Sequence, residues 1–212
     1  MPLIRLTATD LSEMDEVQHI YETALPPSER KLRDEIHALL ERPDYAIVAA
    51  KAGTLVTGFS IIYRSEHQPV GLLEYMATRP ECRNKGLGQL LFRNALELMG
   101  RRIMLVEVEA VTGSGKERSL QLRRQRYYMR LGCILIEGLP YRMPQLNEHA
   151  PPPLNLMLHP GRQRFSLSEQ ILQRWISTIY SDVYGYDGHE DQIDKMIAAW
   201  RTATASTGSS IG

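Results

Sequence analysis

The spacing of hydrophobic and polar positions predicts a strand and two helices at the start of the chain. Residues 3–7 alternate as a strand does, and apolar residues then recur at helical spacing over 14–25, behind a capping box from Asp10 to Glu13. A second apolar stripe is expected to form a helix that Ser28 caps and that a proline ends.

A meander of three antiparallel strands is predicted next. Two strand-like runs are joined by the tight turn "AGT", and a third follows the polar loop "RSEHQP". The three runs are Tyr45–Lys51, Leu55–Tyr63 and Val70–Thr78. The third run leads directly into a basic, glycine-rich turn.

Helices and strands alternate beyond that turn. An amphipathic helix over 87–99 is followed by a strand at 102–110, and a helix over 117–131 is followed by a strand at 133–138. Gly132 stands where a left-handed C-cap is favoured.

The composition changes at Leu139, because five prolines in "LPYRMPQLNEHAPPP" prevent long regular elements. The sequences "SLSE" (Ser166–Glu169) and "DGHE" (Asp187–Glu190) are expected to cap two final helices. We expect a main domain over 1–145, a proline-rich segment with a short strand over 146–160, a helical extension over 161–203 and a disordered tail over 204–212.

Charge and cysteine content exclude several classes of function. Lysine plus arginine and aspartate plus glutamate number 25 each among 212 residues, so the formal net charge is zero, which argues against a general nucleic-acid binder. Cys82 and Cys133 form no CxxC or metal cluster, and neither a signal peptide nor a membrane span is recognisable. We therefore expect a cytoplasmic protein with no nucleic-acid or membrane partner.

The turn "RPECRNKGLG" carries the strongest chemical signal. Pro80 ends the preceding strand, Gly86 and Gly88 let the backbone approach a ligand, and the following helix supplies free N–H groups at its positive end. Arg83 and Lys85 add charge at the rim. The turn is therefore suited to a phosphate or a pyrophosphate.

Two common nucleotide-binding motifs fit this turn poorly. A Walker A loop needs a serine or threonine after its lysine, and a Rossmann loop needs a third glycine where Leu91 stands. A third pattern, R-x-x-G-x-G directly after a strand, is matched at each defined position by residues 83–88.

With this loop the sequence resembles the GCN5-related N-acetyltransferase (GNAT) superfamily. The order and spacing of elements agree over about residues 3–138, and "RYYMRLGC" is similar to the family's second motif, in which a tyrosine stands four residues before a glycine. The resemblance implies an α/β (α+β) fold with a central mixed, mostly antiparallel sheet flanked by helices, here followed by a C-terminal helical extension.

The resemblance also implies that acetyl-CoA is the cosubstrate. Its pyrophosphate would lie on the loop, and backbone groups of the preceding strand would hold the acetyl carbonyl and the pantetheine arm. The loop set is Arg83, Asn84, Lys85, Gly86, Leu87, Gly88 and Gln89, and the strand set is Met76, Ala77 and Thr78. Where the family often has an asparagine contacting the cofactor arm, this chain has Gln121.

Carboxylates in apolar strands are the candidate bases. A lysine-like amine has a pKa of about 10.4, so a base is useful, and burial raises a carboxyl pKa toward neutral pH. Glu107 and Glu74 rank about equally, because branches of the family place the base on either strand, and Glu109 ranks lower. Alternation predicts that Glu74 shares a face with Met76 and Thr78, and that Glu107 shares one with Glu109.

The resemblance makes Tyr128 the acid that protonates the coenzyme A thiolate. Its spacing to Gly132 selects it over Tyr127. Cys82 has no nearby base and is interpreted as incidental, and the arginines of 123–126 as a solvated face. No metal site is predicted, because the histidines lack HExxH spacing.

We therefore expect an acetyl-CoA-dependent N-acetyltransferase that acts on a primary amine of a small molecule or peptide by direct transfer in a ternary complex. The alternative is a non-catalytic acyl-CoA-binding regulatory module, and a nucleotide-binding protein is a weaker third hypothesis. The C-terminal helices could form a lid, a packing layer or a homodimer contact. The sequence does not identify the acetyl acceptor.

Overall fold

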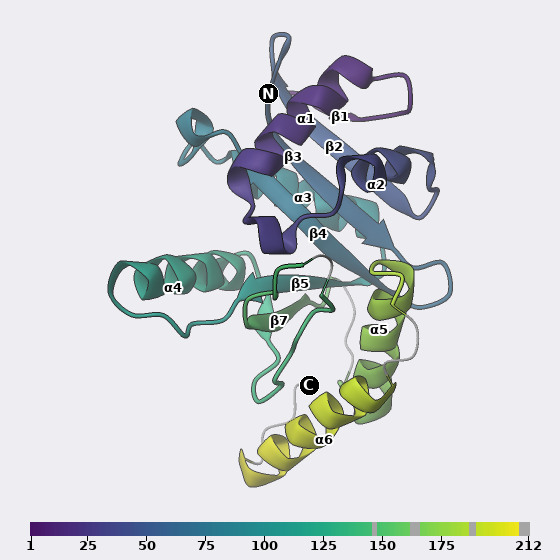
Figure 1. Ribbon diagram of the computed structural model, residues 1–212, viewed down its shortest axis with the longest axis vertical. Coiled ribbons are helices and arrows are strands. Elements are labelled where there is room, and N and C mark those ends of the chain that lie inside the picture. Colours follow the sequence, from purple (N-terminus) through teal and green to yellow (C-terminus); the bar gives the residue numbers. More distant parts are fainter. Residues whose placement is uncertain (146–147, 162–165, 187–189, 208–212) are drawn as a thin grey trace.

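A mixed sheet of seven strands runs through the centre of the protein, with helices on both of its faces (Figure 1). The structure is a computed structural model that describes residues 1–145, 148–161, 166–186 and 190–207. Its strand order is β1-β2-β3-β4-β5-β7-β6, and β4 and β5 are parallel whereas the other neighbours are antiparallel. The expected fold class, with its C-terminal helical extension, is confirmed.

The elements follow the predicted order closely. The strands are β1 (Leu3–Arg5), β2 (Tyr45–Ala52), β3 (Leu55–Arg64), β4 (Val70–Thr78), β5 (Ile103–Glu109), β6 (Ile134–Leu135) and β7 (Leu154–His159). The helices are α1 (Leu11–Ala24), α2 (Arg33–Ala38), α3 (Leu87–Met99), α4 (Gly115–Arg130), α5 (Glu169–Asp182) and α6 (Glu190–Thr207), with 3₁₀ turns at Pro27–Glu29, Leu39–Glu41 and Pro80–Cys82.

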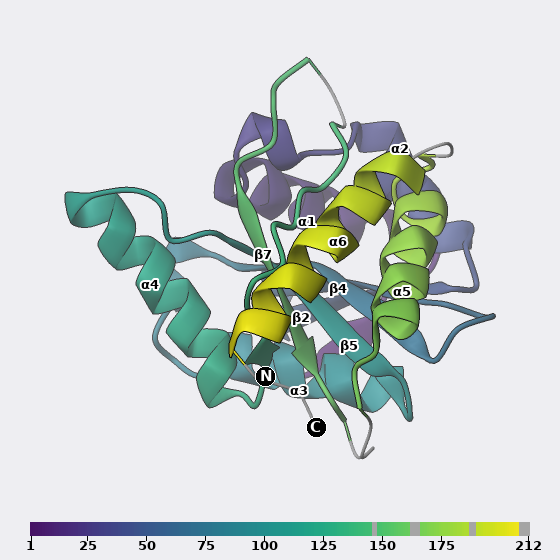
Figure 2. The ribbon, with the colours of Figure 1, turned by 90° about the horizontal axis from the view of Figure 1, so that it is seen from below.

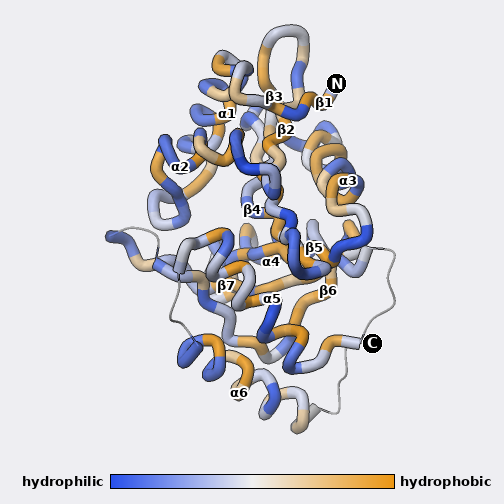
Figure 3. The backbone as a smooth tube through the Cα atoms, turned by 90° about the vertical axis from the view of Figure 1, so that its right-hand side faces the viewer, coloured by the Kyte–Doolittle hydropathy of each residue, from blue (hydrophilic) through white to orange (hydrophobic). Residues whose placement is uncertain are grey.

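Each face of the sheet has its own hydrophobic cluster. The face that carries α1 and α2 also receives apolar residues of α5 and α6, among them Trp175 and Ile179. The opposite face packs against α3, chiefly through Leu91 and Phe92, and against Tyr128 of α4. The central strands are accordingly rich in hydrophobic positions (Figure 3). In the view from below, α6 crosses beneath the sheet and α4 projects to one side (Figure 2).

The strand β7 lies between β5 and β6 in the sheet, although it follows both in the sequence. It pairs with β5 from Met104 to Glu109 and with β6 at two residues. The run beyond the proline-rich segment therefore completes the sheet beside β5.

Two of the predicted caps near the N-terminus are wrong. The carboxylate of Asp10 accepts hydrogen bonds from the Thr7 amide at 2.8 Å and its hydroxyl at 2.7 Å, and it caps no amide of α1. Such local bonds compete with helix capping. Ser28 lies inside a 3₁₀ turn, and α2 begins after Leu32, whose amide donates to Glu35 at 2.6 Å.

The C-terminal caps and tail differ in detail from the prediction. Ser168, not Ser166, caps α5, through a 3.3 Å hydrogen bond from the Ile171 amide. The predicted cap at 187–190 lies mostly outside the described residues, and α6 extends to Thr207. Across the part of the chain that is described, no helix combines the length and hydrophobicity needed to cross a lipid bilayer.

Candidate active site

The parallel strands β4 and β5 separate halfway along their length. They pair from Val70 with Ile103 to Leu73 with Val106, and β4 then continues to Thr78 without a β5 partner. Beyond this fork β4 stays paired with β3, and β5 stays paired with β7. One edge of β4 therefore faces the fork with backbone groups that no described strand uses.

Glu74 occupies a β-bulge at the fork. The register between β3 and β4 shifts here, so that Glu74 is an extra residue on β4. Its side chain turns to the face of α1 and α5 and meets Lys31, whereas Met76 packs toward α3. The prediction that Glu74 shares a face with Met76 is wrong, because the bulge breaks the period-two alternation.

Glu74 and Lys31 form a buried ion pair. Lys31 Nζ lies 2.5 Å from Glu74 Oε1, and the two side chains are 9% and 1% exposed. The same ammonium donates to the Val183 carbonyl at 2.7 Å and lies 6.0 Å from the ring centre of Tyr45 and 5.7 Å from that of Tyr184. The carboxylate of Glu74 is thus neutralised by the ammonium group of Lys31.

Glu107 lies on the first β5 position beyond the fork and accepts two tyrosine hydroxyls. Tyr141 donates to its Oε1, and Tyr184 donates to its Oε2 at 2.5 Å. Burial raises the pKa of Glu107 to about 7, the two hydrogen bonds oppose this rise, and the charges of Glu74 and Glu29 add to it. Glu107 can therefore take up and release a proton near neutral pH.

Glu109 lies two residues further along β5 and pairs with α4. Arg124 Nη1 lies 2.5 Å from its Oε2. Burial and the charge of Glu109 raise the pKa of Glu29, which also interacts with Glu107. The charge of Glu29 thus interacts with both Glu107 and Glu109, as expected if these two side chains lie on the same face of β5.

The glycine-rich turn forms an open N-terminus for α3. Asn84 and Gly86 have positive φ angles of 60° and 79°, and the first helical hydrogen bond runs from the Leu90 amide to the Gly86 carbonyl. The amides of 87–89 therefore have no acceptor within the helix. A Cβ atom placed at Gly86 would meet nothing within 4 Å, so this glycine borders open space.

Helix α4 contacts the turn through two side chains. Arg123 Nη2 donates to Asn84 Oδ1 at 2.9 Å. A Cβ atom at Gly88 would come within 2.7 Å of the hydroxyl of Tyr127, so Gly88 is small enough to admit this ring. Arg83 and Lys85 are exposed at the rim, with their charges available to an anion.

Tyr128 lies on the other face of the sheet from Glu107. Its ring packs 5.9 Å from Phe92 and 5.2 Å from Tyr127, and burial raises its pKa above the usual value. Gln121, which stands where the family often has an asparagine, accepts the Thr112 and Gly113 amides at 3.1 Å each and shapes the turn after β5.

Three residues of this region could not be identified from the sequence. They come from separate segments, and none belongs to a local motif: Lys31, Tyr141 and Tyr184. Their roles depend on contacts between distant parts of the chain, for which spacing gives no signal.

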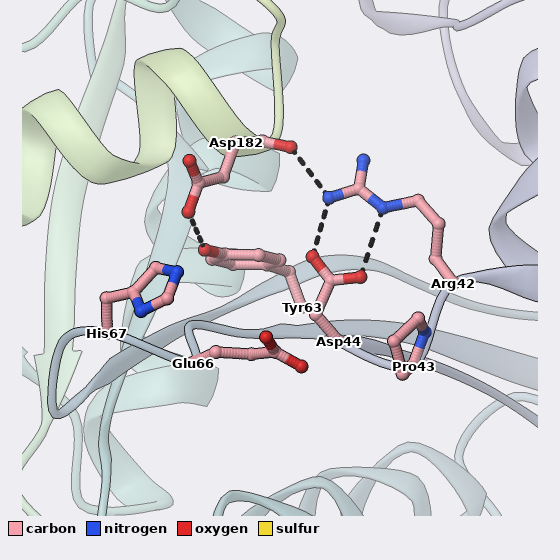
Figure 4. Close-up of a pocket in the computed structure, with 7 residues that line it drawn as sticks. All are labelled: Arg42, Pro43, Asp44, Tyr63, Glu66, His67 and Asp182. Atoms are coloured by element: carbon pink, nitrogen blue, oxygen red, sulfur yellow. Dashed lines mark hydrogen bonds and ion pairs between the residues drawn. The ribbon is translucent and has the colours of Figure 1, made fainter.

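A cavity of about 320 Å³ lies near the start of β4, at the end opposite the turn. Figure 4 shows the residues that line it. It is lined by Arg42, Pro43, Asp44, Tyr63, Glu66, His67 and Asp182. Arg42 pairs with Asp44 at 2.6 Å and Tyr63 donates to Asp182, so these polar groups already bind one another. Within the described ranges no three His, Cys, Asp or Glu residues gather as metal ligands.

Comparison with known proteins identifies the family. The model of the acetyltransferase (GNAT) family matches residues 12–132, more than half of the chain. No curated protein matches the sequence.

Solved structures share the fold at low sequence identity. A GNAT-family protein from Bacteroides thetaiotaomicron, whose name assigns it as an acetyltransferase, is 22% identical with a TM-score of 0.72, over 88% of this chain and 100% of its own. The ribosomal-protein-S18-alanine N-acetyltransferase of Escherichia coli is 16% identical with a TM-score of 0.55, over 77% and 96%. An aminoglycoside 6'-N-acetyltransferase complexed with coenzyme A is 13% identical with a TM-score of 0.60, over 78% and 99%.

The family match covers the turn, the fork and the motif tyrosine, and the similar fold from Bacteroides thetaiotaomicron covers 88% of the chain. The resemblance read from the loop and from "RYYMRLGC" is confirmed. This chain belongs to the GNAT acetyltransferase family.

Proposed function

We propose that the protein is an acetyl-CoA-dependent N-acetyltransferase in which Glu107 is the base and Tyr128 is the acid. One observation carries the proposal: Glu107 lies at the fork of β4 and β5 with a pKa of about 7. A carboxylate with this pKa is ionised often enough to accept a proton at neutral pH and basic enough to hold it.

The turn before α3 is the proposed site of the acetyl-CoA pyrophosphate. The free amides of 87–89, the open space at Gly86 and the exposed charges of Arg83 and Lys85 suit a doubly charged anion. Asn84 would remain tied to α4 through Arg123. The pantetheine arm would follow the free edge of β4 along the backbone of Met76, Ala77 and Thr78.

The reaction would take place between the two faces of the sheet. The amine nitrogen attacks the thioester carbonyl, the C–N bond forms and the C–S bond breaks. The nitrogen gives its proton to Glu107, and the sulfur takes the proton of Tyr128. Because Glu107 and Tyr128 lie on opposite faces, the amine would enter from one side and the thiol would leave toward the other.

Glu107 is the better base of the two glutamates that the sequence ranked equally. Glu74 is bound to Lys31 and 1% exposed, so an incoming amine would have to displace a buried ion pair. Glu107 holds neutral hydroxyls, which can yield one position to a substrate or a water molecule.

The proposed acceptor is a primary amine of a small molecule or a peptide. Proteins of similar fold are named as N-acetyltransferases of a ribosomal-protein alanine and of aminoglycosides. A panel of amino acids, polyamines, aminoglycosides and peptide N-termini therefore covers the proposed classes of acceptor. Release of free thiol from acetyl-CoA, with the acetylated amine identified by mass spectrometry, tests the proposal. Binding of acetyl-CoA without turnover on any amine would instead support a non-catalytic acyl-CoA-binding module.

A further inference from the structure

Two hydroxyls from beyond the family domain bind the carboxylate of Glu107. The family match ends at residue 132, whereas Tyr141 lies between β6 and β7, and Tyr184 follows α5 in the C-terminal extension. Each tyrosine takes one oxygen, Tyr141 binding Oε1 and Tyr184 binding Oε2 at 2.5 Å. Each oxygen of the carboxylate thus accepts a hydrogen bond from one tyrosine hydroxyl.

The end of α5 orients Tyr184 toward the sheet. Gly185 adopts a φ of 59°, and the Tyr186 amide donates to the Tyr180 carbonyl at 3.0 Å. The Gly185 amide also donates to the Ser181 carbonyl at 3.0 Å, which is the bond of an αL helix end, and a glycine in the left-handed region favours this end. The helix therefore stops at a defined point, with Tyr184 held beneath the fork.

The two residues before Tyr184 form hydrogen bonds with three separate segments of the domain. Tyr63 of β3 donates to the Asp182 carboxylate, and Arg42 Nη2 donates to the Asp182 carbonyl at 3.1 Å (Figure 4). Lys31 Nζ donates to the Val183 carbonyl at 2.7 Å. These three hydrogen bonds hold residues 182 and 183 in place, and the side chain of the next residue, Tyr184, contacts Glu107.

We propose that Tyr184 is a positioning residue which, together with Tyr141, holds the Glu107 carboxylate for proton transfer. The C-terminal helical extension is then a part of the catalytic centre and not a separate appendage. This inference rests on the proposed function, in which Glu107 accepts the amine proton.

The hydroxyls favour the ionised form of Glu107. A carboxylate accepts both bonds, whereas a protonated carboxyl must turn its own O–H away from one donor. The groups that face Glu107 or lie next to its partners are Tyr141, Tyr184, Glu74, Glu29, Tyr75, Tyr180 and Lys31. Burial holds the pKa of Tyr141 and of Tyr184 well above the usual range, so both remain donors at every pH of an assay.

A titration of Glu107 tests the inference without reference to activity. In protein labelled with 13C at the glutamate carboxyl carbon, the Glu107 resonance is assigned by its loss in Glu107→Gln. We expect Tyr184→Phe to raise the pKa of Glu107 by about one pH unit, because one charge-assisted hydrogen bond is lost. At pH 7 the ionised fraction then falls about fivefold, and so does kcat, which recovers at higher pH.

Tyr180→Phe is the matched control. It removes a buried hydroxyl four residues earlier, within α5, where the hydroxyl donates to the Arg142 carbonyl and not to Glu107. The control should leave the pKa of Glu107 and the pH profile of kcat unchanged. If Tyr184→Phe also leaves both unchanged, or if the two variants shift them equally, Tyr184 has a purely structural role and the inference is wrong.

The result separates this inference from the proposed function. If Glu107→Gln retains full turnover, Glu107 is not the base, whatever the titration shows. If Glu107→Gln abolishes turnover but Tyr184→Phe shifts nothing, the base is correct and only its positioning by Tyr184 is refuted. A thermal unfolding curve for each variant confirms that it is folded at the assay temperature.

Discussion

Glu74 and Glu107 are the first residues beyond Leu73 and Val106, the last parallel pair of β4 and β5. Both side chains turn to the same side of the sheet, but they meet different partners. Glu74 pairs with Lys31, and Glu107 accepts hydroxyls of two tyrosines. The two positions that follow the last parallel pair therefore carry different groups: a carboxylate paired with a cation, and a carboxylate that can exchange a proton.

Tyr128 should be required for turnover and not for acetyl-CoA binding. We expect Tyr128→Phe to lower kcat by about 100-fold, as is typical of a lost general acid, while acetyl-CoA affinity measured by calorimetry stays within about twofold. Tyr127→Phe is the control, because the Tyr127 hydroxyl lies against Gly88. A Tyr128→Phe enzyme with normal kcat would remove this tyrosine from the mechanism.

Gly86→Val should block acetyl-CoA. The side chain would project into open space before α3, where the pyrophosphate is placed, and affinity should fall by about 100-fold or more. Gly53→Val is a matched control, since Gly53 also has a positive φ, 64°, and open space, but lies in the β2–β3 turn. Both variants carry similar backbone strain, so equal calorimetric affinities for the two would refute the assignment of the turn.

Lys31 and Glu74 should contribute to the free energy of unfolding in a coupled way, so that the loss of one partner costs more than the loss of both. Lys31→Met leaves a buried carboxylate without its cation and should lower the free energy of unfolding by about 3 to 5 kcal/mol. Adding Glu74→Leu should restore at least half of the loss, because an apolar pair needs no counter-charge. Urea denaturation measures both variants, and a double variant no more stable than Lys31→Met would show that the pair is not coupled.

Glu107 should make the fold more stable at acidic than at neutral pH. Folding raises its pKa from 4.5 to about 7, so its stabilising contribution is complete below pH 4.5 and is lost as the pH rises through 7. Between these values the unfolding free energy of the native protein, relative to that of Glu107→Gln, should fall by at most about 1.4 kcal/mol per pH unit. Urea denaturation at pH 5, 6, 7 and 8 gives this difference, and a constant value would contradict the assigned pKa.

Local signals in the sequence predicted most elements of the fold. Period-two and period-3.6 patterns located the meander of β2, β3 and β4, the helix α3 and the strand β5 within a few residues. The glycine-rich turn was recognisable because its chemistry is carried by neighbouring residues. The position of β7 between β5 and β6 was not predictable, because it depends on pairing over a long separation in sequence.

The candidate site was predictable only in part, for the same reason. Glu74 and Glu107 could be selected as carboxylates in apolar strands, but nothing local distinguishes them. They differ in the β-bulge at Glu74 and in their partners from distant segments, because Glu74 contacts Lys31 and Glu107 contacts Tyr184. The hydrogen bond from Thr7 to Asp10 also explains why Asp10 does not cap α1, although the sequence favoured this cap.

The pH dependence of kcat in native protein and in Glu107→Gln, measured with an acceptor identified in the amine panel, tests the central claim most directly. We predict that the native enzyme loses activity below pH of about 7 with a slope of one, and that Glu107→Gln is at least about 100-fold slower and lacks this limb. An enzyme that keeps the same limb after Glu107→Gln would show that another group accepts the amine proton.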